Sequence, residues 1–379
     1  MLLHFRDPSK LKTKRVVFEA TYYARDSGTL EQLKDLSTKR KAIEESINGS
    51  SNLTAAIARE MAGGVTSPIL QDLQKLEKYL PLLENLVANV IQQQNLQILQ
   101  WTSDLKLRWT SALCGPSGHG LGGPKYCRID DLRFELAMML SLYAALLRER
   151  AMELLATDLV ESAMLFRRAS GVYHHLSQDL LPGLQTLLSL DKSPELTSSM
   201  ATAMSLVCLA EAQAVTVRKA EQNMTSGSLV AKLHYGVVMF LEEAINLLQA
   251  SSTDWIDISD KLKRFMTASS VLHEARCRRL IAEEFKKIER LGMAAGILRL
   301  VSRKAHLAKP PGDGTSKLVF KAEITALNEM LRKCEHENDF IWREKLPQPD
   351  EIPLMEGKKI VSAIPYKASG LWRELIFVV

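Results

Sequence analysis

The sequence predicts an all-α protein, and three observations support this fold class. Leu, Ala, Glu, Lys and Met predominate, and these small or straight-chain residues lose little side-chain freedom in a helix. Gly and Pro are sparse, at 19 and 13 of 379 residues. Apolar residues recur three and four positions apart in several long segments, as expected for one face of a helix. With 46% hydrophobic and 25% charged residues, a chain of this length can bury a core without disulfides or a structural metal.

The N-terminal part predicts little regular structure before its first helices. Residues 1–29 are mixed in character, and residues 16–18 form their only β-like run. Residues 30–47 fit a helix that Asn48 and Gly49 end. A heptad-like apolar stripe follows, made of Leu73, Leu76, Leu80, Leu83, Val87 and Val90. Pro81 lies inside it and should kink the helix, so we expect packing within the domain and not an intermolecular coiled coil.

Residues 115–125 (GPSGHGLGGPK) form a glycine-rich connector that invites comparison with a phosphate-binding loop. No strand is predicted before it, no Gly-Lys-Ser/Thr closes it, and its glycine spacing differs from the dinucleotide fingerprint. The segment is therefore predicted to be a surface loop.

The rest of the chain predicts long helices and then an extended arm. Residues 130–156 are apolar around most of the helix circumference, which is typical of a central buried helix. Pro194 suits a first helical turn, with Ser193 as its N-cap. Further helices are predicted at residues 159–190, 194–224, 228–249, 255–304 (broken near Leu291 and Gly292) and 317–334. After Asn338 prolines punctuate an arm that should lie over the helices.

Five scattered cysteines and the absence of a signal-peptide pattern predict a cytosolic protein that is not secreted. The longest uncharged stretches, residues 136–147 and 196–210, are shorter than the ~20 apolar residues of a transmembrane helix. We therefore expect no membrane-spanning segment. The net charge of +5 is too mild to indicate nucleic-acid binding.

No constellation of residues predicts catalysis, a cofactor or a metal. His174 and His175 are adjacent and diverge on a helix, and Cys334 and His336 lack the second ligand pair of a zinc site. The chain also contains no nucleophile elbow, kinase loop or phosphate-loop motif. We expect neither an enzyme nor a small-molecule substrate.

A basic run extends from residue 276 to residue 304, with nine Lys or Arg against three Glu. One interpretation is a solvated helix face. The other is weak attraction to an anionic membrane, to which each basic residue would contribute about 1 kcal/mol. The membrane interpretation singles out Arg276, Arg278, Arg279, Lys286, Lys287 and Arg290.

From residue 130 onward the sequence resembles the Bro-domain (BRO-one) family. Residues 131–137 (DLRFELA) are similar to the family's "SL-x-[FY]-E" helix, and residues 166–176 (FRRASGVYHHL) to its "A-x-x-[FY]-x-x-A-[SA]-G-x-[FY]-x-x-L" helix. Residues 193–195 (SPE) and 209–220 (LAEAQAVTVRKA) resemble its "SP-(D/E)" and "LAQAQE…KA" stretch, and residues 337–347 (ENDFIWREKLP) its "DNDFIYHERVP" arm. Residues 1–129 match only faintly. The short, tail-less architecture is most similar to Brox-type members.

The resemblance implies one boomerang-shaped, elongated domain over residues 1–379. It would have a tetratricopeptide-like solenoid core at residues 130–335 and the arm at residues 336–379. Brox-type members are expected to carry a prenylation box, but this sequence ends in WRELIFVV without a cysteine. We therefore expect no lipid anchor. The apolar ending is either a truncated or alternative terminus, or it packs against the domain.

The resemblance also implies a function: a non-enzymatic adaptor that binds the C-terminal amphipathic helix of an ESCRT-III subunit. Such proteins act at the endosomal membrane in multivesicular-body sorting or membrane remodelling, and would be cytoplasmic and peripherally associated with endosomes. The family's partner groove aligns with residues 203–220 and 228–247 here. Its apolar contact positions match Thr216, Leu229 and Leu233, and Lys232 and Lys219 could pair with partner acids.

Thr216 departs from this pattern, because the family usually has a large apolar residue there. This favours an alternative in which a helical-repeat scaffold has lost the ESCRT-III groove and binds another helical peptide or the membrane surface. Leu229 and Leu233 lie four residues apart on one helix face. In an ESCRT-III-binding adaptor they would line the groove, whereas leucines at this spacing can also simply be core residues.

Overall fold

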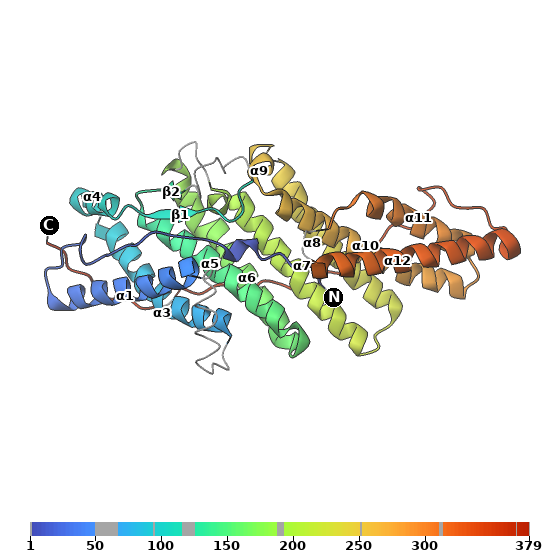
Figure 1. The fold of residues 1–379 in the computed structure, drawn as a ribbon, viewed down its shortest axis with the longest axis horizontal. Coiled ribbons are helices and arrows are strands. Elements are labelled where there is room, and N and C mark those ends of the chain that lie inside the picture. The colour runs from blue at the N-terminus through green and yellow to red at the C-terminus, as the bar shows by residue number, and fades with distance from the viewer. Residues whose placement is uncertain are drawn as a thin grey trace. The chain divides into compact units, whose positions relative to one another are not determined.

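A computed structural model describes residues 2–49, 67–93, 95–115, 126–187, 193–250, 252–310, 314–368 and 370–378. Helices make up most of these residues, which confirms the predicted all-α class (Figure 1). The strands in this described part are β1 (Arg108–Thr110) and β2 (Tyr126–Arg128), paired antiparallel with Trp109 opposite Cys127. The sequence did not predict them. The glycine-rich connector falls mostly outside the described residues, at 116–125.

The chain divides into two compact units, each built from segments that are separated in the sequence. Unit 1 consists of residues 1–5, 151–170 and 203–363, and unit 2 of residues 6–150, 171–202 and 364–379. The sequence predicts a single domain over residues 1–379. The division into two compact units does not test that prediction, so it stays a prediction.

Unit 2 packs its helices around the predicted apolar stripe. Its regular elements, with those that continue into unit 1 given in full, are η1 (Asp7–Ser9), α1 (Ser27–Gly49), α3 (Pro68–Gln93), α4 (Leu96–Asp104), β1, β2, α5 (Leu132–Glu153), α6 (Leu159–His175), η4 (Leu176–Leu180), η5 (Leu181–Leu187) and η6 (Pro194–Leu196). All six residues of the stripe are buried on α3, which confirms that they pack inside the domain. The helix continues through Pro81.

A buried polar network lies inside unit 2. Glu135 on α5 is fully buried and accepts hydrogen bonds from the Arg40 guanidinium and, at 2.6 Å, from Trp109 Nε1. The Tyr79 hydroxyl donates a longer bond of 3.5 Å to the same carboxylate. Because an isolated buried charge is costly, Arg40 and Glu135 must be kept together for this unit to be stable.

The C-terminal residues lie extended along α3 and are held by side-chain amides. Asn89 accepts a bond from Leu375 N at 2.9 Å, and Gln93 donates one to Leu375 O at 2.8 Å. The side chains of Leu375 and Phe377 are buried. The apolar ending therefore packs against unit 2, which is one of the two alternatives expected from the sequence.

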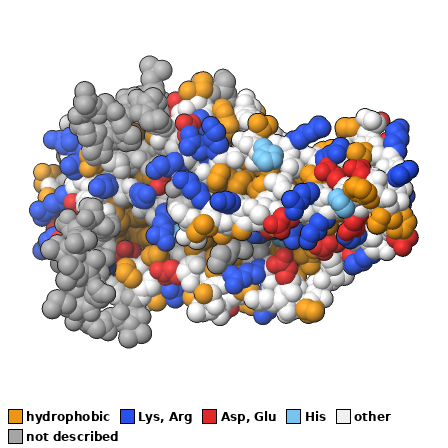
Figure 2. Space-filling view, turned by 45° about the vertical axis from the view of Figure 1, so that its right-hand side comes forward, with side chains coloured by type: hydrophobic (Ala, Val, Ile, Leu, Met, Phe, Trp, Pro, Cys, Tyr) orange, Lys and Arg blue, Asp and Glu red, His pale blue; other side chains and the backbone are white. Residues whose placement is uncertain are grey.

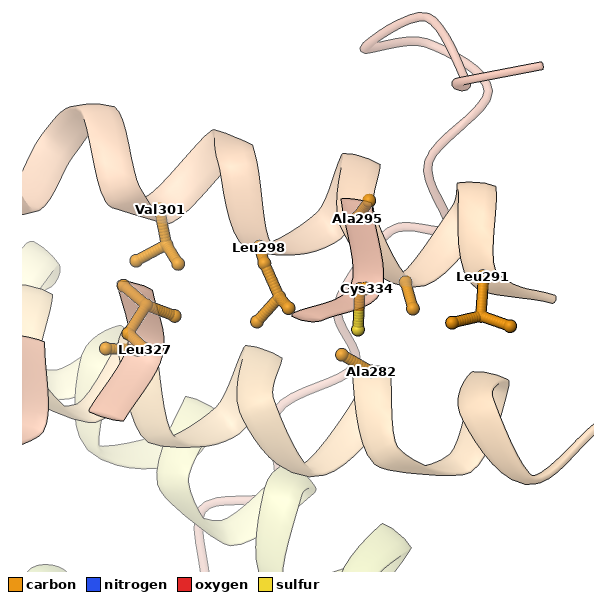
Figure 3. Close-up of a cluster of buried hydrophobic side chains, with 9 residues drawn as sticks. Ala282, Leu291, Ala295, Leu298, Val301, Leu327 and Cys334 are labelled. Carbon is orange, nitrogen blue, oxygen red and sulfur yellow. The ribbon is translucent and has the colours of Figure 1, made fainter. Parts of the chain in front are cut away.

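Unit 1 is a stack of packed helices. Besides the parts of α5 and α6 that belong to it, it contains η3 (Leu154–Ala156), most of α7 (Ser198–Gln222), α8 (Gly227–Ala250), α9 (Ser252–Asp257), α10 (Asp260–Lys287), α11 (Leu291–Leu307), α12 (Gly314–Glu337) and η7 (Asn338–Trp342). Helix α10 packs against α8, α11 and α12. Leu291 and Leu298 of α11 meet Ala282 of α10 and Leu327 and Cys334 of α12 in a buried cluster (Figure 3). The alanines in the cluster permit close helix approach.

Two predicted helices are wrong in extent. The helix predicted for residues 159–190 ends as an α-helix at His175 and continues as the π-turn η4 and the 3-10 segment η5, which contains Pro182. The predicted break near Leu291 is confirmed by the turn between α10 and α11, where Glu289 has a positive φ of 62°. A second break, between α9 and α10, was missed: Ser259 caps α10 by accepting a bond from Leu262 N.

The Ser193 hydroxyl bonds to the Glu195 carboxylate and does not cap a helix, and Pro194 opens the short 3-10 turn η6. Helix α7 begins only at Ser198, with Thr197 Oγ1 accepting a bond from Met200 N.

Helix α7 is the one helix in the described residues that is long and apolar enough to cross a membrane. Most of its apolar length (78%) is buried inside the protein. A core helix of a soluble protein meets the same criterion, so this finding is weak evidence for a membrane span.

Candidate functional site

The predicted groove residues lie on adjacent helices of unit 1, but they differ in exposure. Thr216 on α7 and Leu229 on α8 are half-buried, and the Thr216 hydroxyl donates back to Ala212 O at 2.9 Å. Leu233, one turn after Leu229, is only 4% exposed. Lys219 and Lys232 are exposed. The structure thus brings all five residues to one pair of helices and leaves Leu233 inside the packing.

The extended segment of residues 356–362, which we call the crossing segment, lies across α7 and α8. Lys358 N donates to Lys232 O at 2.9 Å. The Gln213 side chain on α7 donates from Nε2 to Lys358 O at 2.9 Å and accepts from Ile360 N through Oε1 at 3.0 Å. The same Nε2 also donates to Leu233 O at 2.8 Å. One buried amide therefore joins both helices to the crossing segment, much as a neighbouring strand would.

Ion pairs and a ring contact hold the segment from its two sides. Lys232 Nζ lies 2.8 Å from a Glu356 carboxylate oxygen. Lys359 pairs with Glu243 of α8, and its ammonium lies 4.5 Å from the centroid of the Phe240 ring. The predicted partner lysine Lys232 is therefore already neutralised within the chain, and the pKa of Glu356 is lowered by this contact.

Two glycines allow the close approach of the crossing segment to α8. A Cβ at Gly236 would collide with the Gln213 amide and with Lys358 O. A Cβ at Gly357 would collide with the Met239 sulfur and lie 3.1 Å from the Tyr235 ring. The main chain of the segment thus rests directly on the helix.

A buried histidine pair lies beneath this face. His234 Nδ1 of α8 and His273 Nδ1 of α10 are 2.9 Å apart, so one ring donates to the other. His234 Nε2 is 3.3 Å from the Glu221 carboxylate. Burial lowers the pKa of His234 and lowers that of His273 further, because an imidazolium would lose its hydration there. Among the described residues no group of three or more His, Cys, Asp or Glu is placed to hold a metal ion.

Two small cavities adjoin the histidines. One, of about 20 Å³, is lined by Glu221, His234, Arg276 and neighbouring apolar residues. The other, of about 10 Å³, includes His273 in its lining. Each has room for about one water molecule. Neither of these two cavities is large enough for an organic substrate.

The basic run is largely paired with carboxylates. Arg276 and Arg279 both reach Glu323 of α12, Arg278 bonds Glu274 at 2.8 Å, and Lys287 pairs with Glu284 at 2.7 Å. Lys286 pairs with Glu337 at 2.8 Å, and Arg290 with Glu344. All six predicted membrane-facing residues have an acidic partner. On the face shown in Figure 2, basic and acidic side chains alternate over the part that comes forward at the right.

Sequence reasoning missed the residues that shape this face. Gln213 lies within the family-like stretch but was not singled out, and its partners Lys358 and Ile360 are about 145 positions away. Gly236, inside an apolar helix, was the available signal, because a glycine there often marks a close backbone approach. The carboxylates that neutralise the basic run come largely from α12 and the arm, outside the run itself.

Comparison with known proteins gives the class of protein to which this fold belongs. The family model of the BRO1-like domain matches residues 21–375. The chain therefore belongs to the BRO1-like domain family, which confirms the resemblance found in the sequence.

Among individual relatives, the human BRO1 domain-containing protein BROX is 24% identical over 305 residues, covering 77% of this chain and 72% of BROX. Human programmed cell death 6-interacting protein is 24% identical over 271 residues, covering 69% of this chain and 29% of that protein.

Solved structures share the fold. A crystal structure of ALIX in complex with the SIVmac239 PYKEVTEDL late domain has a TM-score of 0.69 at 18% identity over 94% of this chain. The chain spans about half of that ALIX chain (48%). An ALIX BRO1 CHMP4C complex has a TM-score of 0.65 at 18% identity, with 97% of this chain and 95% of the other covered.

Proposed function

We propose that this protein is a non-enzymatic adaptor that binds the C-terminal amphipathic helix of an ESCRT-III subunit on the outer face of α7 and α8. The proposal is supported by the half-burial of Thr216 and Leu229 and the exposure of Lys219 on the adjacent helices α7 and α8 of a BRO1-like domain, at the positions that the family resemblance aligns with the partner groove. The structural similarity to an ALIX BRO1 domain in complex with CHMP4C supports it.

The mode of recognition would be helix-in-groove binding. Leu229 offers a half-buried apolar contact beside the half-buried Thr216, and the partner's apolar residues would pack on this surface at one-turn spacing. Lys219 is exposed and pairs with no carboxylate in the described part of the chain, so it is placed to meet an acidic residue of the partner. Leu233 would support this surface from below, because it is buried.

The endosome is the proposed site of action, with the protein cytoplasmic and peripherally associated, in multivesicular-body sorting or membrane remodelling. A structure described as the basis for endosomal targeting by the Bro1 domain is similar to this chain, with a TM-score of 0.61 over 95% of its length, and this supports the proposal. Membership of the BRO1-like domain family is what supports the adaptor role.

Fluorescence anisotropy tests the proposal directly. Labelled peptides of the C-terminal helix of CHMP4C and of the other ESCRT-III subunits would be titrated with the wild-type protein, with Leu229→Asp and with Lys219→Glu. We expect saturable binding to one peptide, with Kd raised at least about tenfold by Leu229→Asp. Ile245→Asp is the matched control, because Ile245 is also half-buried on α8 but belongs to another part of its surface. Each variant's melting temperature would show that it is folded.

A second candidate function is a BRO1-like scaffold that binds another helical peptide. Thr216 favours it, because truncating a large apolar anchor commonly costs about 2–4 kcal/mol of binding. The burial of Leu233 favours it as well. Absence of binding to every ESCRT-III peptide up to high micromolar concentration would select this candidate. The membrane-surface alternative is less supported, since the residues on which it depended are ion-paired.

A further inference from the structure

The crossing segment presents side chains next to the face proposed to bind the partner helix. Ile360 is 46% exposed, although hydrogen bonds fix the main chain of its segment. Its amide bonds Gln213 Oε1 at 3.0 Å. Thr216 follows Gln213 by three positions on α7, and residues three apart are surface neighbours on a helix. The backbone of Ile360 is thus fixed about one helical turn from Thr216.

The segment also supplies a cation to this surface. Lys232 and Lys359 are neutralised by Glu356 and Glu243. Lys358 is exposed, and in the described part of the chain its ammonium has no carboxylate within ion-pair distance; the same holds for Lys219 on α7. Two lysines that have no acidic partner in the described part of the chain therefore flank Thr216 and Leu229.

We propose that the crossing segment forms one wall of the partner-binding face, and that Ile360 and Lys358 contact the partner. This inference rests on the proposed function and extends it to residues of the arm. Ile360 supplies the apolar contact that Thr216, with its short polar side chain, does not offer. Lys358 and Lys219 select a helix whose apolar ridge is bordered by acidic residues on both sides.

Hydrogen bonds and close packing fix the main chain of the crossing segment before any partner binds. The Gln213 amide fixes the main chain at both Lys358 and Ile360, and the contact of Gly357 with α8 leaves no room for the segment to settle closer. Arg167 of α6 donates to Ser362 O at 2.8 Å and fixes the far end. A partner that docks against a wall already in place loses less conformational entropy on binding than one that must order it.

The charge of the partner follows from the groups around the wall. The lysines of this region are Lys219, Lys232, Lys358 and Lys359. Glu356 and Glu243 neutralise Lys232 and Lys359, so in the described part of the chain Lys219 and Lys358 are the two that have no carboxylate within ion-pair distance. An acidic amphipathic helix is therefore the complementary occupant.

The test compares Ile360→Asp and Lys358→Glu with Leu354→Asp in the anisotropy titration with the ESCRT-III helix peptide that wild-type protein binds. Leu354 is the matched control, because it is a 96% exposed aliphatic residue of the same arm. We expect Ile360→Asp to raise Kd about tenfold or more and Leu354→Asp to leave it unchanged. Lys358→Glu should raise Kd and make Kd less dependent on salt concentration, because a charge attraction to the partner is lost.

Three results would overturn the inference. Two of them concern only the role of the crossing segment, and the third also contradicts the proposed function. If Leu229→Asp abolishes binding while Ile360→Asp and Lys358→Glu bind as wild type does, the face binds the partner without the arm. If Ile360→Asp or Lys358→Glu binds more tightly than wild type, the segment obstructs the site and is not its wall. If wild-type protein binds no peptide, the proposed function fails and this extension fails with it.

Discussion

Two hydrogen bonds join Asn85 to Arg373: the amide oxygen of Asn85 accepts from Arg373 N at 2.9 Å, and its Nδ2 donates to Arg373 O at 3.0 Å. A side chain of α3 thus satisfies both main-chain groups of a residue 288 positions away. Asn89, one turn along, adds a second donor to the same carbonyl at 3.0 Å. Because these bonds are made to the main chain, they hold the C-terminal segment whatever side chain residue 373 carries.

Replacing Asn85 or Asn89 with Ala should weaken unit 2. Each change leaves main-chain groups of the C-terminal segment without partners, at about 1–3 kcal/mol of unfolding free energy per variant. Urea unfolding measures the loss. Gln92→Ala is the control, since Gln92 is exposed on the same helix and should be neutral. An effect of equal size in all three variants would mean that helix propensity, and not the C-terminal segment, is responsible.

Glu135→Gln should destabilise the protein strongly. The substitution leaves the Arg40 guanidinium buried without an opposite charge, which typically costs about 3–5 kcal/mol. Chemical denaturation again provides the measurement. Glu45→Gln removes the exposed partner of Lys41 and should have little effect. If the two variants unfold at the same denaturant concentration, the buried pair does not stabilise the fold.

The histidine pair should make stability depend on pH in a defined range. The pKa values of His234 and His273 are lowered by burial, so the unfolded chain binds more protons at pH values below the ordinary 6.5 of histidine. Stability from this source is complete above about pH 6.5 and declines as the pH falls below it. The pKa of Glu221 is lowered from 4.5 by its bond to His234, so its own contribution is lost only in more acidic solution.

Melting temperatures between pH 7.5 and 5 would detect this decline. A His273→Asn variant should show a flatter profile over the same interval, since it removes the group whose pKa is lowered most. Parallel profiles for the two proteins would exclude the histidine pair as the cause.

Gly236→Ala and Gly357→Ala should each destabilise unit 1 by about 1–3 kcal/mol, because the added methyl group overlaps with the crossing segment or with α8. Gly314→Ala is the matched control: a Cβ there meets nothing within 4 Å, and alanine favours the helix that starts at this residue. Thermal unfolding should rank Gly314→Ala at or above wild type. A stable Gly236→Ala variant would contradict the packing described for the arm.

Thiol alkylation should distinguish the cysteines. Burial raises the pKa of the Cys277 thiol to about 12 and also raises that of Cys334. Both should react slowly with iodoacetamide in the native protein, because the thiolate is the nucleophile. Cys114 and Cys127 are half-buried and should be modified first. Mass spectrometry of timed digests resolves the order, and early labelling of Cys277 would count against the packing of α10.

Local patterns predicted most of the fold, since helix spacing and helix propensity act over a few neighbouring residues. The predicted helix at residues 228–249 corresponds to α8 (Gly227–Ala250), and the one at 30–47 to α1 (Ser27–Gly49). The strands escaped prediction because each has three residues and depends on a distant partner. The boundary at Ser259 was missed because apolar spacing resumes directly after it.

The candidate site could be predicted less well, because exposure and pairing are decided by contacts distant in the sequence. Spacing placed Leu229 and Leu233 on one helix face, but only the packing distinguishes half-buried Leu229 from buried Leu233. Similarly, the charge of the basic run is compatible with a solvated helix face and with a membrane surface, and only the fold brings Glu323 and Glu337 of α12 beside it. Partner-binding roles for these residues stay predictions.

The Gln213 amide has a consequence for how the arm behaves in solution. The arm contains no regular secondary structure at residues 356–362, so its amide protons would be expected to exchange with water within seconds. The N–H groups of Lys358 and Ile360 are, however, bonded to Lys232 O and to Gln213 Oε1. In a deuterium-exchange experiment these two positions should be protected as those of a β-strand are, and they should lose that protection together when Gln213 is replaced.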